Sequence, residues 1–108
     1  HADENDSQQA LERAVERINQ VPLDTARCCL EALEYSEQAI GDIKAALQSD
    51  ARAGAQLVHA GLSMVLINVD TNIDGLEDEA ERRQLAGQRA ALQAEADRLL
   101  ERLLRARS

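Results

Sequence analysis

Large aromatic side chains are almost absent from this sequence, which contains no Phe, no Trp and a single tyrosine, Tyr35. A core must therefore be built from Leu, Ile, Val, Ala and two cysteines, and such a core gains less free energy per buried residue than one with rings. At 108 residues the chain is long enough for one core that buries a modest fraction of its surface. We therefore expect a single domain that gains stability by self-association, most simply as a homodimer.

Long apolar runs are also missing, and no stretch reads as a signal peptide or a bilayer-spanning segment. The two cysteines, Cys28 and Cys29, are adjacent, and adjacent residues of a helix point about 100° apart, so a disulfide between them would disrupt the helix. Two reduced thiols favour a reducing compartment. We expect a cytoplasmic protein with no membrane partner.

Basic residues are scarce in the first three quarters of the chain. Residues 1–81 carry 17 acids and 5 bases, whereas residues 82–108 carry 3 acids and 7 arginines. An acidic body repels phosphate, and a chain without aromatic residues offers little for base stacking. We expect no direct binding of nucleic acid.

The first half of the chain has helical spacing of its apolar residues. Residues 1–6 are polar and predicted to be disordered, and residues 7–108 form the predicted helical domain. A short helix is predicted up to Pro22, which lacks a backbone donor, and a second helix is predicted from the N-cap residue Asp24. The turn after this second helix is expected at Ser49 and Asp50.

The second half predicts two more long helices, the last running from an Asp74–Glu77 capping box to about Arg105. Because the turn after the second helix is short, the second and third helices are expected to form a central antiparallel hairpin. The predicted fold class is all-α, a small helical bundle of three long helices and one short one.

The third helix carries two apolar stripes where an ordinary surface helix has one. One stripe is assigned to the core of the chain, and its residues are Val58, Leu62, Val65, Leu66, Val69, Ile73 and Leu76. The second stripe needs a partner, and we name it the α-ridge; its residues are Leu57, Ala60, Met64 and Ile67. We predict that the α-ridge binds a protein partner, although a helix wrapped on all sides by its own bundle would show the same pattern.

Two residues of the preceding helix are predicted to flank the partner site. Tyr35 is a lone ring with a polar tip, which suits an interface anchor. Cys28 lies off the core stripe on the same weaker face of that helix, and with little positive charge nearby it is expected to be an inert thiol.

A calcium site is the sharpest alternative. Residues 70–81 match the spacing of an EF-hand loop, in which carboxylate and amide oxygens surround a hard cation. The ligands would be Asp70, Asn72, Asp74, Asp78 and Glu81. Because apolar helical spacing continues through this segment, we expect a helix rather than a metal loop there.

Catalytic groups are few, and we expect neither an enzyme nor a bound cofactor. His59 and Ser63 lie one turn apart on a polar helix face, but the sequence around them shows no nucleophile elbow or oxyanion element.

The hairpin reads CCLEALEYSEQAIGDIKAAL, then a short turn, then QLVHAGLSMVLINVDTNIDGL. It resembles the short helical-hairpin proteins of certain Gram-negative bacteria, among them quorum-sensing antiactivators. The resemblance implies a non-enzymatic regulator that binds a LuxR-type transcription factor through an apolar helix face and blocks its dimerisation. A chaperone for a helical client would use the same physics and stays open as an alternative.

Overall fold

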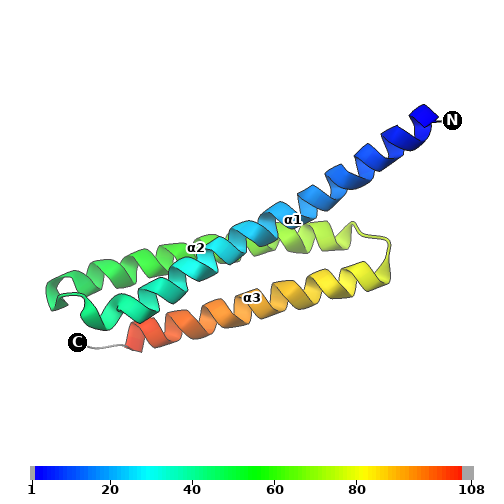
Figure 1. Ribbon diagram of the computed structural model, residues 1–108. Helices are drawn as coiled ribbons and strands as arrows, with labels where there is room; N and C mark the ends of the chain where they lie inside the picture. Colours follow the sequence, from blue (N-terminus) through cyan, green and yellow to red (C-terminus); the bar gives the residue numbers. More distant parts are fainter. Residues whose placement is uncertain (1, 106–108) are drawn as a thin grey trace.

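The computed structural model describes residues 2–105, which form three long helices packed side by side (Figure 1). Helix α1 is Ala2–Ala39, the short 3-10 helix η1 is Ile40–Asp42, α2 is Ala45–Asp74 and α3 is Glu79–Arg105. The described part of the chain contains no strand. The predicted all-α bundle is confirmed.

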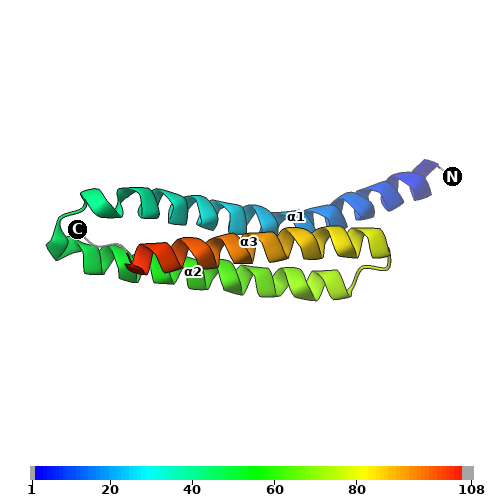
Figure 2. The same cartoon turned by 90° about the horizontal axis from the view of Figure 1, so that it is seen from below.

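Helices α1 and α2 run antiparallel, and α3 returns beside both of them (Figure 2). This confirms the central antiparallel hairpin. Apolar residues from all three helices and from η1 meet along the bundle axis and form one core. The core residues are Leu23, Ala26, Leu33, Ile40, Ala55, Leu62, Leu66, Val69, Leu92, Ala96, Leu99 and Leu103.

The helix break predicted at Pro22 is wrong, because α1 continues through this residue. A proline inside a helix cannot donate to the carbonyl four residues earlier, which here belongs to Ile18. The side-chain amide of Asn72 in α2 donates to that carbonyl instead, at 3.2 Å. A tertiary hydrogen bond therefore replaces the helical one, and α1 remains a single helix.

The turn predicted at Ser49 and Asp50 lies earlier, in the segment of residues 40–44. Gln48 makes this turn possible, since its side chain is buried and its Nε2 donates to the carbonyls of Ile40 and Ile43, both at 3.1 Å. Ile40 and Ile43 also contact the core. Their apolar spacing continues across the turn, which is why the sequence pattern extends the helix too far.

The junction between α2 and α3 also differs from the prediction. Helix α2 runs to Asp74, and α3 begins at Glu79 rather than at the expected Asp74–Glu77 capping box. Asp78 caps α3, because its Oδ1 accepts from the backbone N–H groups of Ala80 at 2.8 Å and Glu81 at 3.2 Å.

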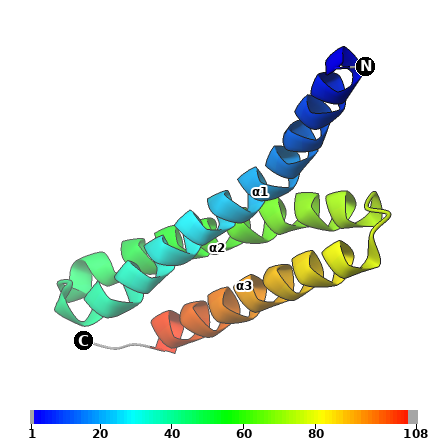
Figure 3. The ribbon, with the colours of Figure 1, turned by 45° about the vertical axis from the view of Figure 1, so that its right-hand side comes forward.

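The amino-terminal part of α1 projects beyond the other helices (Figures 1 and 3). It includes residues 2–6, the segment for which the sequence predicts disorder, while residue 1 and residues 106–108 lie outside the described residues. Asp3 and Glu4 in the first turn favour a helix there, because acidic groups interact well with a helix N-terminus. We name residues 3–18 the arm.

Candidate functional site

The α-ridge lies on the side of α2 that faces away from the core. Leu57 is 75% exposed, Met64 67% and Ile67 59%, whereas Leu62 and Leu66, their neighbours on the helix, are fully buried. Ala60 is exposed between them. The described helices thus leave the whole stripe uncovered, so a central helix wrapped by its own bundle does not explain it.

The two predicted flanking residues, Cys28 and Tyr35, lie on α1, the helix that precedes α2. Cys28 and Tyr35 are both exposed, and their separation of seven residues puts them on one face of α1. Both cysteines are free thiols. The structure therefore offers the residues predicted for partner binding as two accessible faces on neighbouring helices.

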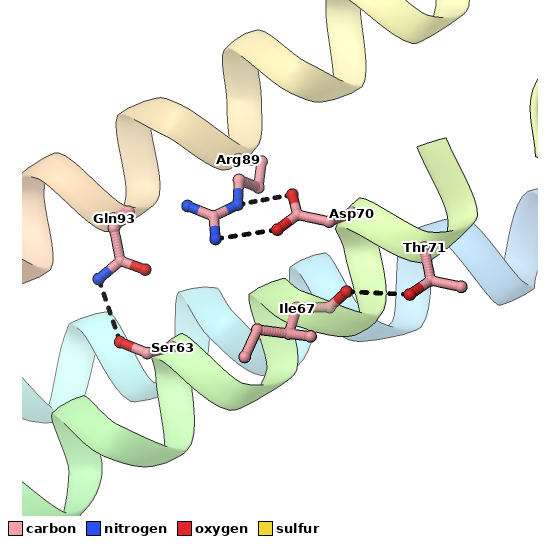
Figure 4. Close-up of polar contacts among 6 residues, drawn as sticks. All are labelled: Ser63, Ile67, Asp70, Thr71, Arg89 and Gln93. Carbon is pink, nitrogen blue, oxygen red and sulfur yellow. Dashed lines mark hydrogen bonds and ion pairs between the residues drawn. The ribbon is translucent and has the colours of Figure 1, made fainter. Parts of the chain in front are cut away.

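A polar strip crosses between α2 and α3, next to the core (Figure 4). Asp70 accepts two hydrogen bonds from Arg89, one from Nε at 2.8 Å and one from Nη2 at 3.1 Å. One to two turns away, Gln93 Nε2 donates to Ser63 Oγ at 3.1 Å. These contacts fix the position of α3 along α2, since a paired guanidinium and carboxylate hold a specific geometry.

His59 completes this strip. Its Nε2 lies 2.7 Å from Asp97 Oδ1, and the same oxygen accepts from Gln93 at 2.9 Å. The hydrogen bond from His59 holds the pKa of the Asp97 carboxyl below its usual range, with a smaller contribution from Gln93. Ser63 accepts a hydrogen bond from Gln93, and His59 is hydrogen-bonded to Asp97. These contacts join α2 to α3.

Asp97→Asn is expected to lower the free energy of unfolding at pH 7 by about 0.5–1 kcal/mol, since the pair is partly exposed. A carboxyl with a lowered folded pKa stabilises the protein above its unfolded pKa, and this stabilisation disappears as the pH falls through the folded pKa. Urea unfolding at pH 7 and at about pH 3 tests this. The deficit of the variant should be smaller at the lower pH. The exposed control Asp50→Asn should show no such convergence, and an equal deficit at both pH values would contradict the assignment.

The five candidate calcium ligands are spread over two helices and their junction. Asp70 is paired with Arg89, Asn72 donates to the carbonyl of Ile18 and Asp78 caps α3. Asp74 is the last residue of α2, and Glu81 is in the first turn of α3. Among the described residues no three His, Cys, Asp or Glu side chains gather in a way that could hold a metal ion.

Three residues of the polar strip come from α3 and are not predicted from the sequence: Arg89, Gln93 and Asp97. These three residues are spaced four apart, and Gln93 and Asp97 each directly follow a core residue, Leu92 and Ala96. This pattern can be recognised in the sequence. It identifies a polar row beside the core that needs partners on a neighbouring helix.

The fold and these surfaces define a class of protein, a small all-α bundle. A polar strip joins two of its helices, α2 and α3, and its outer faces carry accessible apolar stripes. A family model described as Formiminotransferase-cyclodeaminase matches residues 1–91. The chain belongs to this family, whose name describes enzymes. The resemblance to quorum-sensing antiactivators is not addressed by this match and stays a prediction. No curated protein and no solved structure matches the chain.

Within residues 2–105, none of the helices has the length and apolarity needed to cross a bilayer.

Proposed function

We propose that this chain is a helical protein-binding module within an enzyme family, and that it works through the α-ridge rather than through catalytic groups of its own. The observation that carries this proposal is the exposure of Leu57, Met64 and Ile67 on one face of α2. In this role the module would hold a partner in place for the chemistry that the family name describes, in the cytoplasm.

An apolar stripe of this kind fits an amphipathic helix laid along it. Ala60, a small residue in the middle of the α-ridge, lets a partner helix approach closely. Met64 supports the same role because its flexible thioether adapts to different apolar surfaces.

The charge around the α-ridge indicates the chemistry of that partner helix. Asp50 and Asp74 are exposed near the two ends of α2, and the only Lys or Arg between Ala45 and Asp74 is the half-buried Arg52. A partner helix with basic residues beside its apolar face would therefore be attracted to this surface.

Sequestration of a LuxR-type transcription factor is one version of this function, and a chaperone for a helical client is another. Both would use the α-ridge and differ only in the identity of the bound protein. A crosslinking experiment on the α-ridge distinguishes sequestration from chaperone function, because it identifies the bound protein.

A photo-crosslinking residue at position 64, introduced into the protein in its native cells, tests the proposal. We expect covalent adducts with a protein that contains a basic amphipathic helix, because Met64 is the centre of the α-ridge. The same residue at position 91, on an exposed part of α3, is the matched control and should give none.

Ile67→Asp in the same protein should abolish the adducts at position 64, since a buried unpaired carboxylate is costly at an apolar interface. Adducts with a LuxR-type factor would support sequestration, and adducts with many helical proteins would support a chaperone. Equal amounts of adduct at positions 64 and 91, or no adduct at position 64, would show that the α-ridge is not the binding site.

A further inference from the structure

The arm and the first turns of α3 are two segments of the bundle that lack buried side chains. Every residue from 3 to 18 is exposed, and the first buried residue of α1 is Leu23. In α3 no side chain is buried between Glu79 and Ala91, and the first buried one is Leu92. The arm diverges from α3 towards the amino terminus (Figure 3). Both segments therefore have free surface for a further element between them.

An open groove lies between these two segments. Its volume is about 810 Å³, and its apolar lining consists of Leu11 and Val15 from the arm and Leu85 from α3. Leu11 is 59% exposed and Val15 42% exposed, while Leu85 is half-buried because it also packs against the core. A helix as short as the arm is marginal in water without tertiary packing. A ligand that packs along this apolar lining would stabilise the helical arm.

The rim of the groove is acidic. Glu12 and Glu16 from the arm and Glu81 from α3 line it, and the only base in the lining is Arg17. The other polar side chains of the lining are neutral carboxamides, among them Gln84. The arm and the first turns of α3 thus form one surface with an apolar centre and net negative charge at its edges.

The chain does not compensate this negative charge. Within residues 2–105 none of the three rim carboxylates is in an ion pair with another side chain. Other glutamates of α3 are paired with arginines of their own helix, such as Glu79 with Arg83 and Glu101 with Arg105. Unpaired carboxylates beside an apolar lining favour a ligand that has an apolar face and positive charge next to it.

We propose that the groove binds an amphipathic helix of another protein, with Lys or Arg residues on both sides of its apolar face. Two helices that diverge leave space for a third, whose side chains pack between theirs. At 1.5 Å per residue the arm is about 24 Å long, so a helix of about 16 residues would cover it. The site goes beyond the proposed function and is independent of it, since no residue of α2 lines the groove.

The arm of a second copy does not have this chemistry. Residues 3–18 carry five acids and two bases, so a second arm in the groove would bring like charge against the acidic rim. The occupant must therefore supply basic residues that the arm lacks.

Two synthetic peptides of about 16 residues test the proposal. Both have leucines on one helix face, and the remaining positions are lysine in one peptide and glutamate in the other. The isotope-labelled protein carries Ile67→Asp, which disrupts the α-ridge as a competing site. In its amide NMR spectrum the Leu/Lys peptide should shift the signals of residues 8–20 and 81–88, and the Leu/Glu peptide should shift neither set.

Charge-removing variants measure the contribution of the rim. Glu12→Gln, Glu16→Gln and Glu81→Gln together should weaken binding of the Leu/Lys peptide about tenfold, because three exposed charge interactions of modest strength are lost. The matched control neutralises three exposed carboxylates outside the groove and should change the affinity less than about twofold. Its substitutions are Glu31→Gln, Asp42→Asn and Asp50→Asn.

Several results would overturn the proposal. Groove amides that do not respond to the Leu/Lys peptide would do so, as would an affinity that Leu11→Gln leaves unchanged. Equal effects of the rim variant and its control would mean that the peptide is attracted to the acidic chain in general. Groove amides that shift on dilution of the free protein and do not respond to the peptide would place a second copy there. Crosslinking at Met64 reports on the α-ridge separately, so none of these results decides the proposed function.

Discussion

Leu66→Ala is expected to lower the free energy of unfolding by about 3 kcal/mol, because it removes a fully buried side chain and leaves a cavity in the core. The core contains no aromatic side chain that could move into the space, since every large buried residue is aliphatic. For a chain of this size the loss should lower Tm by more than roughly 10 °C. Thermal and urea unfolding of the purified chain measure both quantities.

The neighbouring residue provides the control. Ile67 lies next to Leu66 on the same helix but is 59% exposed, so Ile67→Ala should change the free energy of unfolding by less than about 0.5 kcal/mol. Both variants must be compared at the same protein concentration, because self-association adds to apparent stability. Equal losses for the two variants would show that the α-ridge is part of the core in solution.

Gln48→Glu is expected to have a similarly large effect, about 3 kcal/mol near pH 8. The wild-type amide is buried and donates to the carbonyls of Ile40 and Ile43, whereas a carboxylate would bring negative charge against two acceptors. Burial and these carbonyls would raise the pKa of the introduced carboxyl, and the guanidinium of Arg52, which donates to Gln48 Oε1 at 3.5 Å in the wild type, would offset only part of this rise. The stability of the variant should therefore be greatest below the unfolded pKa of Glu and should fall as the pH rises.

Gln48→Leu separates the effect of charge from the effect of lost donors. Leucine fills similar space but leaves both carbonyls without their donor, so its loss of about 1–3 kcal/mol should be the same at pH 4 and pH 8. Urea unfolding at the two pH values compares the variants. A deficit of Gln48→Glu that does not change with pH would show that water reaches the introduced carboxyl.

Much of the fold follows from periodicity. The stripe of Leu62, Leu66 and Val69 predicts a core-facing helix, and the structure buries these three residues. The continuation of α1 past residue 22 is harder to predict because it depends on a distant side chain. The carbonyl of Ile18 needs a donor because Pro22 lacks one, and that donor, Asn72, lies 54 residues after Ile18. Nothing near Pro22 in the sequence indicates this contact.

The exposure of the α-ridge agrees with its position opposite the core stripe, whereas its role in partner binding stays a prediction. The polar strip is predicted only in part. The sequence places His59 and Ser63 on one polar face, but their partners on α3 depend on how two helices align, which spacing within one helix does not determine.

The hydrogen bond between Asn72 and Ile18 has a consequence for the order in which the chain matures on the ribosome. The carbonyl of Ile18 emerges long before its donor, so the stretch around Pro22 cannot reach its final form until α2 has been synthesised almost to its end. Orientation of the arm is therefore a late event, which delays any contact through the arm until the hairpin beneath it is complete.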